Sequence, residues 1–333
     1  MILSDIIHTV TEKVMSPGGA AAGLLFLTAF GSALFAYWKI EEHKSVRDFF
    51  DFAFPKEVIL HPSAKADALF WITKRFIMPV VLIPLGFSFV AGMAYLVHQL
   101  ITTMFQLHAP LIAGEPDALV IVIFTISMIV AYDLSYYLYH LAQHKIPILW
   151  ELHKVHHSAE VLVGITKDRV HPLDDLMNRV WDGVIPGIAF GIWTVIALDP
   201  VEATIFGINV YVMRNILMMD FVRHTHFKIS FGPLDNVILS PHWHQLHHSV
   251  DPHHYDKNFG LLFSFWDRLF GTACVPKPDE DFKFGLMDRN VREYQSLFGL
   301  YILPLQRMGG HVAKWVRPRA RPIAKQQTDA PQS

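Results

Sequence analysis

The sequence contains almost no cysteine: Cys274 is the only one among 333 residues. One cysteine cannot form an internal disulfide, which excludes a disulfide-stabilised secreted fold and fits a reducing compartment or indifference to redox conditions. It also excludes an iron–sulfur cluster held by several thiolates. A G-x-G-x-x-G dinucleotide motif and a recognisable flavin motif are absent as well. Any electrons that this protein uses are therefore expected to come from a separate partner.

Charge is also scarce, since Asp, Glu, Lys and Arg make up 17% of the chain and hydrophobic residues 52%. Residues 18–38 and 76–108 carry no charged side chain, and residues 118–139 carry only Asp133. About 20 apolar residues in a helix match the ~30 Å hydrocarbon core of a bilayer. We therefore predict three spanning helices. The net charge of −2, without a basic stripe, gives no indication of a nucleic-acid partner.

Two shorter apolar runs, 183–198 and 203–213, flank the sequence DPVE. Each is marginal for a straight crossing, so we predict a helical hairpin that enters the bilayer and returns to the same side. The first apolar run lacks the basic leader and the cleavage site of a signal peptide. Lysine and arginine are frequent in 39–75 and absent from 97–117, which places the first connection in the cytoplasm.

These patterns predict an all-α integral membrane protein with about three spanning helices, a helical hairpin and a cytoplasmic, histidine-rich helical cap. Residues 1–117 are expected to be a membrane anchor and residues 118–275 the metal-binding domain. Residues 276–333 are expected to form a polar segment, an interfacial helix and a disordered tail.

Histidine is the residue that the sequence has in excess, and 14 of its 20 histidines lie in 140–171 and 224–254. Histidines four apart on a helix project from one face, and the middle histidine of an H-x-x-H-H motif is rotated by roughly 100° from the last. Two such motifs facing each other would offer imidazoles to two adjacent metal positions. The candidate ligands are His140, His144, His153, His156, His157, His224, His244, His247 and His248.

The donor set narrows the choice of metal. Imidazole suits zinc, copper, iron and nickel. The chain has no H-E-x-x-H motif of zinc proteases and no E-x-x-H motif of carboxylate di-iron proteins. Haem needs one or two axial ligands rather than nine histidines. We interpret the pattern as a histidine-rich di-iron centre, which zinc could occupy in a purified sample.

The order H-x-x-x-H at 140–144, H-x-x-H-H at 153–157, a lone histidine in RHTHF and then SPHWHQLHHS resembles the sterol desaturase/fatty acid hydroxylase superfamily. The segments RVHPLDDL (169–176) and DKNFGLLFSFWDRLFGT (256–272) are similar to stretches of that family, and the resemblance covers residues 118–275. The spacing is closest to the alkylglycerol monooxygenase-like and bacterial branch. The resemblance implies a membrane-bound enzyme, in the bacterial inner membrane rather than the endoplasmic reticulum.

The family implies a di-iron oxygenase that hydroxylates or desaturates a lipid with dioxygen. Its substrate would enter from the bilayer, and its electrons would come from a cytochrome b5-like protein, a ferredoxin or a reductase. Some members have a second histidine four residues before the lone one, where this chain has Asp220. Either Asp220 is a ligand, or His226 replaces it, or the metal keeps an open or water-filled position there.

Further residues are candidates for supporting roles. Those for a metal or outer-sphere contact are Asp220, His226, His171, Asp133, Asn258 and Asp267, and those for lining a substrate cavity are Phe124, Met128, Tyr132, Tyr136 and Tyr137. Ordinary helix packing explains the five cavity candidates better than a lining role does, whereas roles as caps or turn residues explain Asn258 and Asp267 equally well.

Two other functions remain open from the sequence alone: a membrane metal-dependent hydrolase of lipids, and a non-catalytic metal-binding membrane protein. The absent H-E-x-x-H motif disfavours the first. The position of the histidines at span ends, rather than at mid-membrane depth, disfavours transport.

Overall fold

The computed structural model describes residues 27, 30–38, 45–77, 83–112, 117–197, 204–205, 208–209, 220–277, 280–287 and 291–316. Helices dominate these ranges, and the strands among them are the antiparallel two-residue pair β1 (Thr204–Ile205) and β2 (Ile208–Asn209). The predicted all-α class is therefore confirmed.

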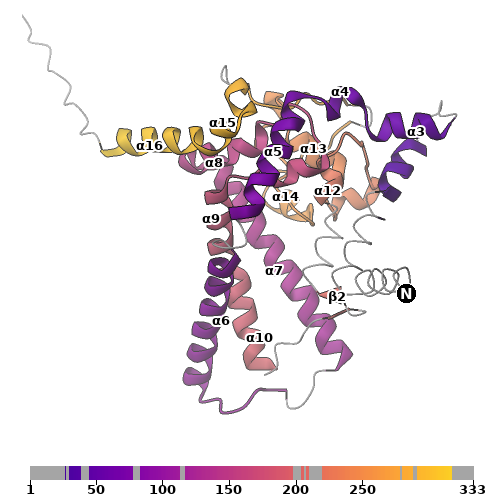
Figure 1. Cartoon of the computed structure of the whole chain (residues 1–333). Helices are drawn as coiled ribbons and strands as arrows, with labels where there is room; N and C mark the ends of the chain where they lie inside the picture. Colours follow the sequence, from indigo (N-terminus) through magenta and orange to yellow (C-terminus); the bar gives the residue numbers. More distant parts are fainter. Residues whose placement is uncertain are drawn as a thin grey trace, which may run out of the picture.

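Long helices descend from a cap of shorter elements: α6 (Ile83–Phe105), α7 (Ala118–Lys145) and the pair α9 (Pro172–Asp182) and α10 (Ile185–Ile196) (Figure 1). Three segments among the described residues are long and apolar enough to cross a membrane: Ser88–Phe105, Ala118–Lys145 and Pro172–Ile196. Large apolar side chains such as Leu96, Leu100 and Ile126 are exposed on them. Lipid would cover this surface in a bilayer.

One of the three spanning segments, Pro172–Ile196, was not predicted as a full crossing. The run 18–38 lies mostly outside the described residues, and only Leu27 and residues 30–38 are described, as helix. The spanning role of 18–38 therefore stays a prediction. Helix α9 precedes α10 through a short turn and extends the apolar run 183–198 to a full crossing. The extension was not predicted from the sequence because α9 carries charged residues. Within the protein Asp174 accepts the hydroxyl of Tyr139, and Asp182 accepts that of Ser135.

The first arm of the expected hairpin thus runs to the far end of the bundle. There the carbonyl of Ile196 accepts the backbone N–H of Ile112, from the connection between α6 and α7. Of the second arm, 203–213, only β1 and β2 lie within the described residues. The chain is back in the cap at α12 (Asp220–Arg223), as the hairpin prediction requires (Figure 1).

Helices α6 and α10 pack closely because α10 presents glycines one turn apart. A Cβ at Gly187 would lie 2.8 Å from Cβ of Met93, and one at Gly191 would lie 2.7 Å from the carbonyl oxygen of Ala94. Small residues four apart allow this backbone approach between membrane helices. The G-x-x-x-G spacing therefore fixes the α6–α10 pair below the cap.

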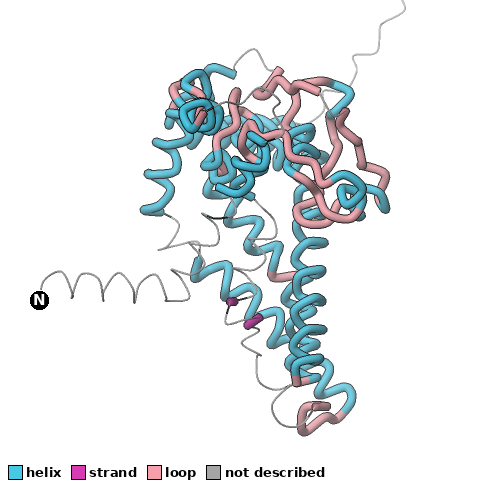
Figure 2. Tube along the Cα trace, turned by 90° about the vertical axis from the view of Figure 1, so that its right-hand side faces the viewer, coloured by secondary structure: helices cyan, strands magenta, loops and turns pink. Residues whose placement is uncertain are grey.

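The cap is made of short helices joined by loops (Figure 2). Its elements are α3 (Val46–Ala53), α4 (Lys56–Ile59), α5 (Pro62–Ile77), α8 (Pro147–His157), η2 (Gly164–Asp168), α12, η3 (Gly232–Asn236), α13 (Pro241–His247), η4 (Pro252–His254), α14 (Phe265–Leu269), η5 (Val291–Gln295), α15 (Leu297–Tyr301) and α16 (Leu303–Val316). Helix α16 packs on α8 and extends outward from the cap (Figure 1).

A buried ion pair fixes the end of α8. The guanidinium of Arg169 donates to Asp67 on α5 at 2.6 Å, and also to the carbonyls of Val155 at 3.0 Å and Tyr294 at 2.8 Å. Arg169 and Asp67 are both almost fully buried. Breaking such a pair leaves an uncompensated buried charge. The contact therefore holds the last turn of α8, where His156 and His157 lie, in a set position.

Candidate metal centre

The first histidines of the site lie at the junction of α7 and α8. His140 and His144 are one turn apart on α7, with ring centroids 5.2 Å apart. Helix α8 begins immediately afterwards, with Pro147 at its start, where a missing N–H costs nothing. It packs back on α7 and carries the first H-x-x-H-H motif into contact with that pair.

The second motif lies on α13, a short helix that also begins with a proline, Pro241. His244 and His247 lie within this helix, and His248 is its C-cap residue. His224 follows directly after α12, which packs on α13. All of these histidines are buried, with exposed fractions of 4% or less.

The structure brings the nine predicted histidines together in two groups, within each of which the candidate ligand atoms all lie within 4.8 Å of one another. The five-histidine group contains His140, His144, His153, His157 and His247, and the four-histidine group contains His156, His224, His244 and His248. In the four-histidine group the Nε2 atoms converge: His224 lies 3.2 Å from His156 and 3.0 Å from His244.

The two motifs share their histidines reciprocally. The outer pair of the first motif, His153 and His157, belongs to the five-histidine group, while its middle member, His156, belongs to the other. In the second motif His244 and His248 belong to the four-histidine group, and His247 crosses to the five-histidine group. This division follows the helix, because residues four apart share a face and the middle residue is rotated away.

The two groups suit transition-metal ions. Among the described residues, the buried Nε2 atoms of His144, His157 and His247 have no hydrogen-bond partner. Buried polar atoms in native proteins almost always have one, or bind an ion. Both donor sets consist of imidazole nitrogens, which bind iron, zinc, copper or nickel.

Burial sets the charge state of these side chains. Loss of solvation, with the neighbouring imidazoles adding to it, lowers the pKa of His247 to about 3. The same causes lower the pKa values of other group members outside the spanning helices well below 6.5: His156, His157, His244 and His248. At neutral pH these rings are uncharged, the form that binds a metal.

Two rings of the five-histidine group are oriented by one loop. Nδ1 of His140 lies 2.9 Å from the carbonyl oxygen of Phe259, and Nδ1 of His247 lies 2.7 Å from that of Lys257. A carbonyl can only accept, so both Nδ1 atoms carry the proton and Nε2 remains free to bind a metal.

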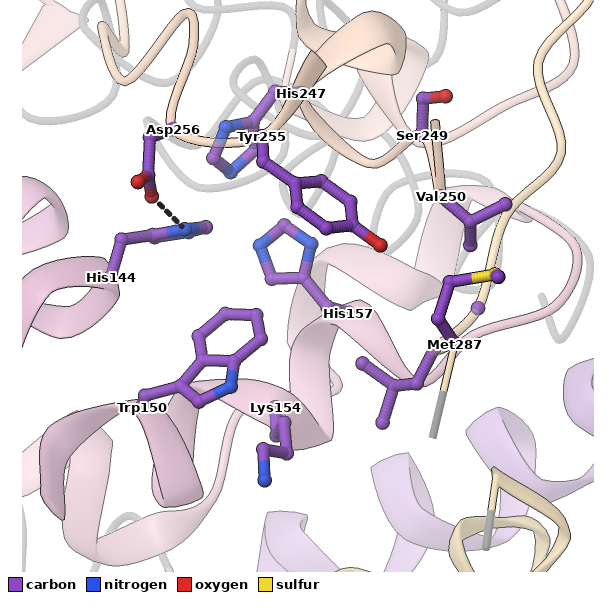
Figure 3. Close-up of a pocket in the computed structure, with 12 residues that line it drawn as sticks. His144, Trp150, Lys154, His157, His247, Ser249, Val250, Tyr255, Asp256 and Met287 are labelled. Carbon is purple, nitrogen blue, oxygen red and sulfur yellow. Dashed lines mark ion pairs between the residues drawn. The ribbon is translucent and has the colours of Figure 1, made fainter. Parts of the chain in front are cut away.

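A pocket of about 390 Å³ reaches the five-histidine group (Figure 3). His144, His157 and His247 form its inner wall, and Trp150, Val250, Leu286 and Met287 supply apolar surface. The remaining lining residues are Lys154, Ser249, Tyr255, Asp256 and Gly285. No member of the four-histidine group lines it. The five-histidine group is therefore the one that a small ligand can approach through this pocket.

Comparison with known proteins gives this arrangement a family. Residues 125–272 match the model of the fatty acid hydroxylase family. The matched segment contains all nine histidines. The predicted membership in the sterol desaturase/fatty acid hydroxylase superfamily is thus confirmed.

Curated relatives of the chain are named for lipid oxidation. The chain is 31% identical to an alkylglycerol monooxygenase of Caenorhabditis elegans over 46% of its own length and 28% of the relative's. It is 26% identical to human cholesterol 25-hydroxylase over 48% and 56% of the two chains, and 29% identical to rat methylsterol monooxygenase 1 over 41% of each. The match spans less than a third of the alkylglycerol monooxygenases. No solved structure matches the chain.

Within residues 125–272, three predicted supporting residues hold the loop that orients the histidines. Asn258 donates to the carbonyls of Trp243 and Cys274, and its φ of 55° is one that asparagine tolerates. Asp267 accepts the N–H groups of Phe259 and Gly260. Asp133, on α7, accepts those of Leu262 and Phe263 and the indole N–H of Trp266.

Two other supporting candidates, His171 and His226, lie outside both groups, and the role of Asp220 stays a prediction. His171 caps α9 by accepting the N–H of Leu173. His226 lies 2.7 Å from the carbonyl oxygen of Phe52 and packs on its ring. Asp220 is the first residue of α12, and its side chain lies outside the described residues.

None of the five residues predicted to line a substrate cavity lines the pocket just described. Phe124, Met128 and Tyr132 pack against α10. Tyr137 is fully buried and bonds with the hydroxyl of Thr272, whereas the ring of Tyr136 contacts that of His140 at 5.3 Å. The lining role of these residues stays a prediction.

Sequence reasoning missed residues that contact the group from the pocket side. Trp150 contacts His144, with ring centroids 4.9 Å apart, and lies three and seven residues before His153 and His157. Helical spacing alone could have identified it as sharing their face. Asp256 and Met287 approach from distant loops and gave no such signal.

Proposed function

We propose that this chain is a membrane-bound di-iron oxygenase that hydroxylates or desaturates a C–H bond of a lipid. The observation that carries the proposal is the pair of adjacent, buried, all-histidine groups, one of which meets a partly apolar pocket. The match of residues 125–272 to the fatty acid hydroxylase family and the lipid oxygenases among the relatives support the same activity.

In this proposal, the five-histidine and four-histidine groups each bind one iron through Nε2 atoms. Iron bound there supplies the activation of dioxygen that removes hydrogen from an unreactive carbon. The protein keeps the rings neutral through burial and orients them through the carbonyls of Lys257 and Phe259. We propose residues 118–275 as the catalytic unit.

The pocket defines the proposed substrate contact. Trp150, Val250, Leu286 and Met287 would pack on an alkyl segment and exclude water, and the wall of His144, His157 and His247 would face the carbon that reacts. We propose that the lipid enters from the bilayer that surrounds the spanning helices.

An electron donor has to be supplied from outside the catalytic unit. The sequence lacks a nicotinamide or flavin motif and a cysteine set. We propose a cytochrome b5-like protein, a ferredoxin or a reductase as the electron donor. We also propose that the chain lies in a bacterial inner membrane with its cap in the cytoplasm, where the donor would bind.

The test is expression of the full chain in a host, with lipid profiling and measurement of metal in the purified protein. We expect two irons per chain and a lipid that is heavier by one oxygen atom, labelled when isotopic dioxygen is supplied. A lipid lighter by two hydrogen atoms would mean desaturation. One zinc per chain with a product formed without dioxygen would contradict the proposal in favour of a hydrolase.

The matched variants are His247→Ala and His253→Ala. His247 belongs to the five-histidine group, whereas His253 is exposed in η4. We expect the first change to abolish the product and the second to leave it. Equal activity of the two variants would contradict the assignment of His247.

A further inference from the structure

One carboxylate faces the five-histidine group from outside it. Asp174, in the first turn of α9, is 1% exposed. Its Oδ1 accepts the hydroxyl of Tyr139 at 2.8 Å and the side-chain amide of Gln143 at 2.6 Å. Both donors lie on α7, on either side of His140 in the sequence. Asp174 is therefore held in place by the same helix that carries two histidines of the group.

The second oxygen of this carboxylate is available for a histidine. Oδ2 of Asp174 lies 3.7 Å from Nδ1 of His153. Both atoms are buried, and neither has a hydrogen-bond partner among the described residues. Nε2 of His153 points the other way and lies 3.1 Å from Nε2 of His140, inside the group. A closer approach of about 0.7 Å would bring the facing atoms to an ordinary hydrogen-bond distance.

Other contacts to the group differ from this one. His140 and His247 face neutral carbonyl oxygens. Nδ1 of His144 lies 3.7 Å from Asp256, but that side chain is 40% exposed and also pairs with Lys145. Among the described residues, Asp174 is the buried carboxylate that faces a ring of the group.

We propose that Asp174 is a positioning residue: its Oδ2 accepts the Nδ1 proton of His153 and holds Nε2 toward the metal. Tyr139 and Gln143 saturate Oδ1, so that Oδ2 is left for the ring. A carboxylate behind a ligating histidine fixes the tautomer and makes the ring a stronger ligand, and loss of such a partner costs about 10–100-fold in metal affinity. The inference rests on the proposed binding of metal by the five-histidine group.

The test measures Fe(II) affinity of the full-length protein in detergent, after metal removal and without oxygen, in competition with a chelator. We expect Asp174→Asn to weaken one of the two sites by about 10–100-fold and to leave the other unchanged. Asp174→Glu, which keeps a carboxylate acceptor, should recover part of the loss. The matched control is Asp175→Asn, the same change at the next residue, whose carboxylate pairs with Lys74. It should bind both irons as the unmodified chain does.

Affinity of Asp174→Asn equal to that of the unmodified chain at both sites would overturn the inference and leave the proposed function standing. If the unmodified chain binds no Fe(II), the proposed function fails as well. Should Asp174→Asn not fold, Tyr139→Phe decides, because it removes one hydrogen bond to Oδ1 without changing charge. Weaker Fe(II) binding of Tyr139→Phe at one of the two sites supports the inference, and affinity equal to that of the unmodified chain at both sites contradicts it.

Discussion

The five-histidine and four-histidine groups are built from the same two motifs but have different surroundings. Carbonyl and carboxylate oxygens face the outward Nδ1 atoms of His140, His144, His153 and His247, and the pocket reaches this group. In the four-histidine group, Nδ1 of His156 and Nδ1 of His244 have no partner among the described residues. Under the proposed function, the five-histidine group would meet the substrate, and the four-histidine group would hold the second metal away from the pocket.

The largest expected effect comes from removing a ligand of either group. We expect His247→Ala and His244→Ala each to lower product formation by about a thousandfold or more, since members of a catalytic unit fail together. Product formation and iron content of the purified variants measure this. If His244→Ala keeps substantial product formation while His247→Ala loses it, the four-histidine group is not required for the reaction.

The second-largest effect is expected from narrowing the pocket, which reaches only the five-histidine group. Val250→Trp narrows the pocket beside the five-histidine group, and we expect product formation to fall by about ten- to a hundredfold as the substrate is displaced. Iron content should not change, because the residue belongs to neither group. The same change at the exposed Val237 is the control. Full activity of Val250→Trp would show that the substrate approaches by another path.

Protonation should destabilise the metal-free protein through both groups. The pKa values of His156, His244 and His247 are lowered in the folded chain, that of His247 to about 3, so at these rings the unfolded chain takes up protons first as pH falls below 6.5. Each such ring then lowers the free energy of unfolding by up to about 1.4 kcal/mol per pH unit. We expect the melting temperature in detergent to fall steadily from pH 6.5 to pH 4.5, measured by tryptophan fluorescence. A flat profile would contradict the burial of neutral rings.

The smallest effect is expected at Asp256. Its carboxylate faces His144 but is exposed and shared with Lys145, so solvent screens the contact. We expect Asp256→Asn to change Fe(II) affinity by less than about threefold, while asparagine tolerates its φ of 59°. Chelator competition measures this beside Asp174→Asn. A loss as large as that of Asp174→Asn would remove the distinction between buried and exposed carboxylates.

The grouping of the histidines could be predicted from the sequence because it depends on local helix geometry. Spacing of four residues puts His140 with His144 and His153 with His157, and rotation separates His156 from its neighbours. Contacts between segments that are distant in the sequence could not be predicted, because no local residue pattern indicates them. Asp174 reaches His153 only because α9 packs on α7 and α8, and Lys257 reaches His247 through the loop after η4.

The prediction of spanning helices succeeded where apolar residues are continuous. It was too short where carboxylates within a span have partners inside the protein. Helix α7 was recognised from its apolar run, although it continues beyond residue 139 to Lys145. The crossing Pro172–Ile196 was shortened in the prediction because Asp174, Asp175 and Asp182 interrupt its hydropathy. Hydropathy treats every carboxylate as exposed to lipid, whereas these have partners inside the protein.

The reciprocal sharing of His156 and His247 has a consequence for how the centre is assembled. Because α8 supplies His156 to the four-histidine group and α13 supplies His247 to the five-histidine group, neither group can form from a single segment of the chain. Both groups are incomplete until α13, which carries His244 and His247, has been synthesised and has docked. Under the proposed function, loading of both irons would require the completed cap, and a shift of α8 or α13 would move ligands of both metal sites.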